Sequence, residues 1–138
     1  MIEDYTIKDG IYLVSDEDTL DLHNNYDFTG ITYSVAERRA TLTWVRSSGD
    51  WVPATEPLRL QLEFHGVSCF RFIPRDPGIP VTEDKCRSSA GYWKDEDWCD
   101  GVMICKANSD SDWLRAFHFQ SGATVTIAAD ETKAIIRR

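Results

Sequence analysis

The chain has 138 residues, a hydrophobic content of 42% and a formal net charge of −8 at pH 7. This length suits one domain with one core, and the hydrophobic content excludes the composition of disordered chains. An acidic chain lacks the cationic surface that nucleic acids and anionic membranes require, so a cationic partner is favoured instead. We therefore predict a single domain over residues 1–138 that binds neither nucleic acid nor a membrane.

Most of the negative charge lies in residues 1–27, which contain eight carboxylates and one lysine and therefore carry a net charge of −7. The segment has no sustained hydrophobic period, although Ile11–Val14 predicts a short edge strand. Its start lacks the basic and apolar regions of a secretory signal. We therefore expect a cytosolic protein in which the four cysteines stay reduced.

Two hairpins are predicted in the middle of the chain. Apolar and polar residues alternate over residues 31–35 and 40–44, and a four-residue loop at 36–39 would place Val35 opposite Ala40.

The second of these hairpins begins with the alternating residues 58–64. A turn through His65–Val67 would then place Leu62 opposite Phe70.

A third hairpin is predicted over residues 113–129. A three-residue loop at Gln120–Gly122 keeps the apolar residues of both strands on one face and places Phe117 opposite Val125. Gly122 then occupies the loop position that favours left-handed backbone.

Between the second and third hairpins, Pro74, Pro77 and Pro80 interrupt regular structure. Residues 75–101 show no clear period. A stretch of this length is predicted as one long irregular loop, which is either functional or contains a short element. Residues 102–106 and 132–138 add two further strands. The resulting six to eight strands predict an all-β antiparallel meander, closed as a sandwich or a flattened barrel.

Acidic and aromatic residues gather inside the long loop. They are Trp93, Asp95, Glu96, Asp97, Trp98 and Asp100. The run lacks the glycine and the terminal glutamate of a calcium-binding loop, whereas aromatic anchors within a polar rim are typical of protein interfaces. We predict that these six residues bind a basic protein partner. A solvated acidic loop whose tryptophans pack on the core is the alternative.

The cysteines and histidines do not predict a metal site or a cofactor. The chain has no Cys-x-x-Cys and no His-x-x-x-His spacing, so no two ligands are preorganised. Cys86 and Cys99 flank the long loop and could form a disulfide if the protein met an oxidant.

His118 is the candidate for a general base, but the hairpin register turns it away from Phe117 and Phe119. A general base also needs an orienting carboxylate and a pocket. The chain has no nucleophile elbow, phosphate-binding loop or dinucleotide fingerprint. The sequence therefore predicts no catalytic residue. A small-ligand-binding or enzymatic β-fold with a pocket near His118 is the alternative hypothesis.

Four segments appear in a fixed order along the chain: Leu22–Asn24 before a strand hairpin, Leu60–Val67, Phe117–Gly122 and Val125–Ile127. In this order the chain resembles small all-β bacterial immunity proteins, the cytosolic antidotes of secreted polymorphic toxins. Residues 75–101 have no counterpart in the resemblance. It implies inhibition by binding and supplies no catalytic residue. The leading hypothesis is therefore a non-enzymatic cytosolic protein that binds a basic protein through its acidic and aromatic surface.

Overall fold

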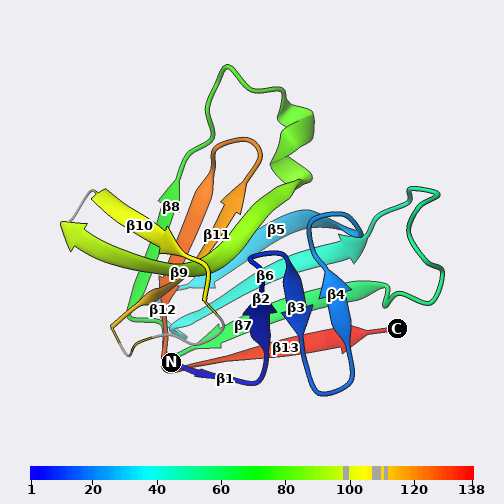
Figure 1. The fold of residues 1–138 in the computed structure, drawn as a ribbon. Coiled ribbons are helices and arrows are strands. Elements are labelled where there is room, and N and C mark those ends of the chain that lie inside the picture. The colour runs from blue at the N-terminus through cyan, green and yellow to red at the C-terminus, as the bar shows by residue number, and fades with distance from the viewer. Residues whose placement is uncertain (98–99, 107–109, 111) are drawn as a thin grey trace.

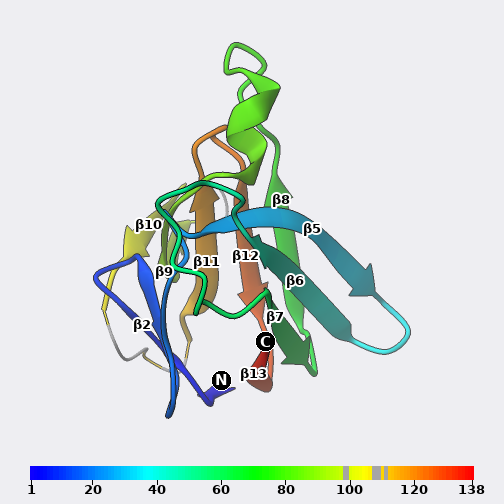
Figure 2. The same cartoon turned by 90° about the vertical axis from the view of Figure 1, so that its right-hand side faces the viewer.

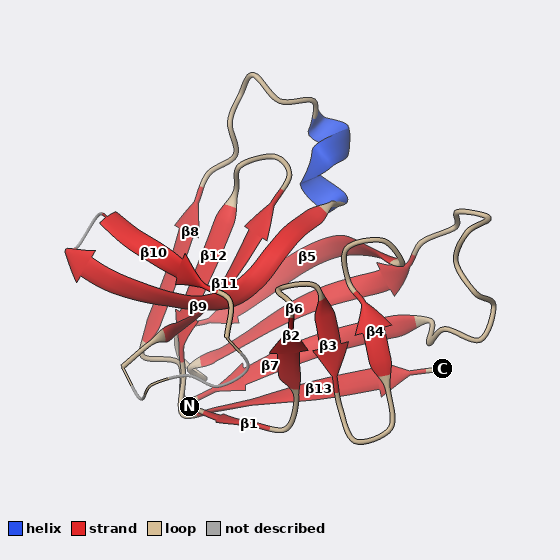
Figure 3. Cartoon of the chain, in the orientation of Figure 1, coloured by secondary structure: helices blue, strands red, loops and turns tan. Residues whose placement is uncertain are grey.

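The computed structural model describes residues 1–97, 100–106, 110 and 112–138, with only the backbone described at 95–97 and 100–102. This part of the chain forms thirteen strands and one short 3-10 helix (Figures 1 and 3). The strands are β1 Ile2–Glu3, β2 Thr6–Lys8, β3 Tyr12–Val14, β4 Thr19–Asp21, β5 Tyr26–Ser34, β6 Arg39–Arg46, β7 Arg59–His65, β8 Cys69–Ile73, β9 Arg87–Asp97, β10 Asp100–Ile104, β11 Leu114–Phe119, β12 Thr124–Ala128 and β13 Glu131–Arg137; the helix is η1 Val81–Lys85.

The first large sheet has the order β1-β13-β7-β6-β5. Its neighbours are antiparallel except for β1, which runs parallel to β13. The alternation in β7 buries Leu60, Leu62 and Phe64 completely, as expected for a strand with one face on the core. The C-terminal strand was predicted, and β13 confirms it.

The second large sheet has the order β10-β9-β11-β12-β8 and is antiparallel throughout. Within it, the predicted hairpin of β11 and β12 is confirmed: Phe117 lies opposite Val125. Gly122 has φ +86°, the left-handed conformation that the three-residue loop requires.

The two large sheets face each other, and their aromatic residues meet between them. The ring of Phe117 in β11 lies 5.7 Å from that of Trp44 in β6 and 6.4 Å from that of Phe64 in β7. All three residues are fully buried. None of the sheets closes into a barrel, so the predicted all-β fold is an antiparallel sandwich.

A small third sheet, β2-β3-β4, lies in front of β6, β7 and β13 in the view of Figure 1. It buries Ile7, Leu13 and Leu20 in the common core. The prediction of one edge strand in residues 1–27 therefore underestimated this region, which holds β1 to β4 and the start of β5.

The β5–β6 hairpin exists, but its predicted register is wrong. Tyr33, not Val35, lies opposite Ala40, so the loop comprises residues 35–38. A shift of two residues leaves every side chain on its predicted face, which is why alternation alone did not exclude the wrong register. Farther along, a bulge at Thr29 separates the partners of Phe28 and Gly30.

The predicted pairing of β7 with β8 is also wrong. β7 pairs with β6 and β13, whereas β8 pairs with β12 in the opposite sheet. Gly66, with φ +68°, carries the chain from one sheet to the other. The alternating residues of β7 are buried, and Phe70 of β8 packs against the same core from the opposite sheet. Alternation does not reveal which sheet a strand joins.

Residues 75–101 are not one irregular loop. They contain η1 and most notably β9, an eleven-residue strand between β10 and β11. Ala90, Gly91 and Tyr92 are consecutive buried residues. The residues on either side of these three are mainly polar or charged, so neither an alternating pattern nor a continuous apolar run marks the strand in the sequence.

Candidate functional site

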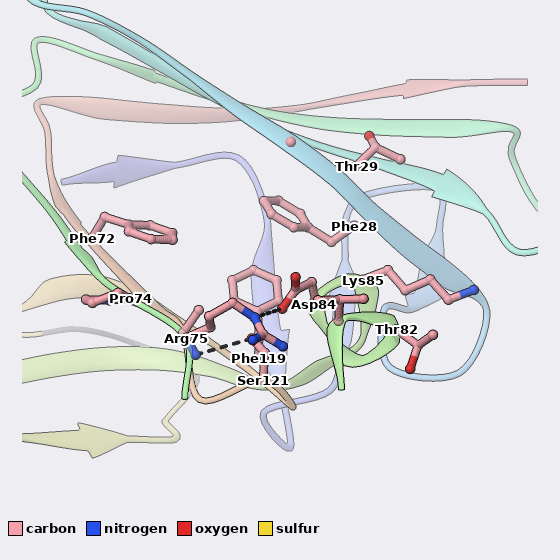
Figure 4. A pocket seen from close by; sticks show the side chains of 13 residues that line it. Phe28, Thr29, Phe72, Pro74, Arg75, Thr82, Asp84, Lys85, Phe119 and Ser121 are labelled. Carbon is pink, nitrogen blue, oxygen red and sulfur yellow. Dashed lines mark hydrogen bonds and ion pairs between the residues drawn. The ribbon is translucent and has the colours of Figure 1, made fainter. Parts of the chain in front are cut away.

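A pocket of about 650 Å³ opens where the edge strands of the two large sheets come together. Its walls come from β5, β8, η1 and the turn between β11 and β12 (Figure 4). In Figure 2 η1 lies above β5 and beside that turn. The pocket thus combines segments that lie far apart in the sequence.

Apolar side chains dominate the lining. They are Phe28, Phe72, Pro74, Val81, Phe119 and Ala123. The rings of Phe28 and Phe119 are 4.5 Å apart, and Phe119 is almost fully buried. Phe72 and Val81 are instead 53% and 73% exposed. The pocket therefore has a core-like aromatic base and an apolar wall that reaches solvent.

The aromatic surface continues beyond the pocket along the same pair of edge strands. Tyr33 of β5 stacks on Phe70 of β8 with ring centroids 4.6 Å apart. Tyr33 and Ile73 are partly exposed. Exposed apolar residues that cluster in this way commonly mark a site of interaction.

Hydrogen bonds between backbone groups position η1 over the pocket. Asp76 N donates to the Ser121 carbonyl, and Gln120 N donates to the Cys86 carbonyl, both at 2.8 Å. These bonds attach both ends of the segment to the β11–β12 turn. Pro80 precedes the helix with φ −56°, a conformation that proline favours.

Charged side chains lie at the mouth of the pocket and are arranged in pairs. Arg75 Nε donates to Asp84 Oδ1 at 2.8 Å. Lys85 Nζ lies 3.6 Å from Asp27 Oδ2. A mostly apolar pocket with a few polar groups at its mouth, and of this volume, is typical of a binding site for a small molecule.

Sequence analysis did not single out Arg75, Asp84 or Lys85. The interruption of the hydrophobic period by prolines was the signal in this region, and it indicated a functional segment without identifying residues. Phe119 was assigned to a strand, whereas Phe28 lies before the predicted strand at residues 31–35. A pocket between them depends on how the two sheets meet.

Five of the six predicted partner-binding residues belong to β9 and β10 and are not among the residues that line the pocket. Trp93 is half-buried in β9, opposite Met103 and Leu114. The backbone of Asp95, Glu96 and Asp97 continues β9, and Asp100 begins β10; the structure does not describe their side chains. Trp98 lies outside the described residues. The structure therefore gives the strand positions of five of the six residues and leaves their joint surface undefined.

His118 is half-buried in β11, and its Nδ1 lies 2.8 Å from Thr124 Oγ1. It is not among the residues that line the pocket, whereas its neighbour Phe119 is. Adjacent strand residues point to opposite faces, so the same register that places Phe119 at the pocket turns His118 away.

The cysteines that the structure describes are separate thiols. Cys69 belongs to β8, Cys86 follows η1, and Cys105 follows β10 and is exposed rather than in a strand as predicted. Burial raises the pKa of the Cys86 thiol. Its predicted partner Cys99 lies outside the described residues. Among the described side chains, no three His, Cys, Asp or Glu residues are grouped to hold a metal ion.

Acidic residues from the first 27 positions gather around two shallow hollows on another part of the surface. Glu3, Asp4 and Asp16 line one, and Asp4, Asp16, Glu17 and Asp18 line the other. Arg138 at the end of the chain reaches Asp18 and forms an ion pair there. The uneven charge along the sequence is therefore also uneven in space.

The chain matches no protein-family model, no curated protein and no solved structure in the comparisons made with them. Within the described part of the chain, no helix is long and apolar enough to cross a bilayer. The geometry of the chain itself therefore has to support any functional proposal.

Proposed function

We propose that the protein binds a small apolar molecule in the pocket between β5, β8 and η1. The observation that carries this proposal is the aromatic lining of a concave site of about 650 Å³, with Phe28, Phe72 and Phe119 contributed by three different strands or their ends. Ligand pockets generally enclose about 300 to 1,000 Å³ and are lined mainly by apolar and aromatic side chains.

This proposal develops the alternative that the sequence raised, a small-ligand-binding β-fold, but moves the site. The pocket lies on the Phe119 side of β11 and not on the His118 side. It assigns His118 no role in the ligand site.

A neutral apolar dye, Nile red, tests the proposal with the folded protein. We expect its fluorescence to rise with the wild type and to fall by more than half with Ala123→Leu, which adds volume to the lining. Ala54→Leu is the matched control, since Ala54 is exposed in a loop away from the pocket. Equal fluorescence with all three proteins would reject the pocket as the binding site.

We also propose, as a second function, that the protein binds a basic protein partner. The net charge of −8 and the carboxylates gathered around the two acidic hollows support it. Complementary charge would accelerate association and make it sensitive to salt. In this form the protein would inhibit its partner by binding, as the resemblance to immunity proteins implies.

Affinity capture at low and high salt tests the second function, followed by titration of the purified partner. The variant Asp95→Asn, Glu96→Gln, Asp97→Asn removes three of the four carboxylates of the predicted site. The variant Asp16→Asn, Glu17→Gln removes two of the five carboxylates that line the acidic hollows. Glu37→Gln, in the exposed loop of the β5–β6 hairpin, is the control. The proposal would be supported by a basic protein that the control binds with unchanged affinity and that one variant binds about tenfold more weakly. Equal affinity for all variants would contradict it.

A further inference from the structure

The residues that line the pocket include more cations than carboxylates, in contrast to the chain as a whole, although Asp27 beside the pocket pairs with Lys85. The lining includes Arg75 and Lys85 against one carboxylate, Asp84. The chain carries a net charge of −8. Two cations among the lining residues of an acidic protein are a feature that an apolar ligand alone does not explain.

Arg75 retains hydrogen-bonding capacity toward a ligand. Its Nε donates to Asp84 Oδ1 at 2.8 Å and its Nη2 to the Ile79 carbonyl at 2.5 Å. Its third nitrogen, Nη1, has no hydrogen bond to any residue that the structure describes. Two fixed contacts therefore hold the guanidinium in place, and its remaining donors are free for an acceptor.

Lys85 adds positive potential without a fixed hydrogen bond. Its Nζ is 3.6 Å from Asp27 Oδ2, beyond the length of a normal hydrogen bond, and the side chain is 56% exposed. In Figure 4 it extends along the opposite side of the pocket from Phe72 and Pro74. Its ammonium contributes to the field at the mouth, whereas Arg75 offers the directed donors.

We infer that the ligand is an apolar molecule with a single carboxylate. Its apolar body lies against Phe28, Phe72 and Phe119, and its carboxylate accepts hydrogen bonds from Arg75. Hydrogen bonds between two charged groups are roughly twice as strong as those between neutral groups, so the carboxylate fixes the orientation of the ligand. This inference rests on the proposed binding of a small apolar molecule in the same pocket.

Pairs of probes with the same skeleton separate the carboxylate from the apolar body. The pairs are 2-naphthoate with 2-naphthamide and octanoate with octanamide, titrated into the full chain by calorimetry. Backbone amide shifts of Gly30, Ser121 and Ala123 report whether binding is in the pocket. We expect each carboxylate to bind about tenfold more tightly than its amide, the ratio that one charge-assisted hydrogen bond supplies.

Two variants with opposite expected effects test the role of Arg75. Arg75→Gln should abolish the preference for the carboxylate and leave amide binding within about twofold, because glutamine can still donate to the Ile79 carbonyl. Asp84→Asn should tighten carboxylate binding about threefold, since it removes the charge that competes for Arg75. A merely structural disturbance of η1 would weaken all four probes. Lys133→Gln, on β13, is the charge-matched control.

The outcomes distinguish the inference from the proposal beneath it. Equal binding of carboxylates and amides in the pocket would overturn the inference and keep the apolar binding site. Amide shifts confined to other parts of the protein, or no binding by any probe, would overturn both. Tighter carboxylate binding that Arg75→Gln leaves unchanged would also overturn the inference, because the charge would then be recognised elsewhere.

Discussion

The β11–β12 hairpin and β9 are neighbours in one sheet, yet only the hairpin can be read from the sequence. In the hairpin, Phe117 and Phe119 alternate with less apolar residues, and Gly122 marks the turn. This pattern predicts both the strands and the register in which they pair. In β9, Ala90, Gly91 and Tyr92 are buried in succession. Both strands of the hairpin also contain four consecutive buried residues, Leu114–Phe117 and Thr124–Ile127, so burial on both faces does not by itself hide a strand. The difference lies in the residue types: the hairpin keeps large apolar side chains on one face beside a recognisable turn, whereas β9 combines small, polar and charged residues without a period.

Each of the two regions also holds a fully buried arginine, and the two arginines are satisfied differently. Arg115 in β11 bonds to the carboxylate of Glu3, with Nη2 2.5 Å from Oε2. Arg87 in β9 donates to the carbonyls of Gly10 and Ile11 at 2.7 and 2.6 Å. Charge is therefore matched by charge in the hairpin and by backbone dipoles in β9, and the consequences of removing each arginine should differ.

The largest effect is expected for Arg115→Met. The change leaves Glu3 with its negative charge in a nearly buried position. The hydroxyl of Tyr92, 2.5 Å from Glu3 Oε2, would then be its remaining side-chain donor among the described residues. Removing one partner of a buried ion pair typically costs about 3–5 kcal/mol of unfolding free energy. Urea denaturation measures this loss.

The double variant Glu3→Met, Arg115→Met provides the control. Replacing both charges by apolar groups should recover most of the stability, because no unpaired charge remains. A double variant as unstable as Arg115→Met alone would show that lost packing, rather than the unpaired charge of Glu3, causes the effect.

The second effect concerns Tyr5, which belongs to the same buried cluster as Arg115 and is 3% exposed. Burial is the main cause that raises the pKa of Tyr5 to about 12 from its ordinary value of 10.0. The folded state thus favours the neutral phenol. The contribution of the neutral Tyr5 phenol to the free energy of unfolding is complete below pH 10. It is lost as the pH rises through the pKa of Tyr5 in the folded state.

We expect the stability of the wild type relative to Tyr5→Phe to fall by about 1.4 kcal/mol per pH unit between pH 10 and 12, or about 2–3 kcal/mol in total. Urea denaturation of both proteins at several pH values gives this difference. Parallel stability curves for the two proteins across this window would contradict the assignment.

Arg87→Met should cost less than Arg115→Met, about 1–2 kcal/mol. The carbonyls of Gly10 and Ile11 lose the guanidinium but keep the N–H groups of Ala90 and Leu22 as donors. The variant also removes Arg87 Nε, a buried group without a hydrogen bond. Burial lowers the pKa of Arg87 to about 10, which reflects the cost of keeping this cation inside.

Hydrogen exchange locates the effect of Arg87→Met. Because Arg87 ties β9 to the loop between β2 and β3, we expect faster exchange at Ile7 and Leu13 and little change at Phe117. Uniform acceleration across both large sheets would argue against this local role.

These contrasts explain what the sequence could and could not predict. Leu60, Leu62 and Phe64 alternate, so their strand was predicted, but the pairing partner of β7 was not. Alternation fixes the face of a strand, and the choice between two sheets depends on long-range packing. The pocket depends on that choice, because Phe28 and Phe72 belong to opposite sheets.

The smallest effects concern two glycines, one from each region, which are required for different reasons. Gly122 has φ +86°, so Gly122→Ala should cost about 1 kcal/mol through backbone strain. At Gly91 an added Cβ would lie 2.5 Å from the carbonyl oxygen of Ile104, so Gly91→Ala should cost about 1–2 kcal/mol by pushing β9 away from β10. Thermal or urea denaturation measures both losses.

Asparagine distinguishes the two causes. It tolerates left-handed backbone, so Gly122→Asn should be more stable than Gly122→Ala. Gly91→Asn should be less stable than Gly91→Ala, because a larger side chain worsens a steric conflict. The same ranking of Ala and Asn at both positions would contradict this distinction. A glycine required for a turn is visible beside a predicted hairpin, whereas one required by the approach of a neighbouring strand becomes apparent only once that strand is placed.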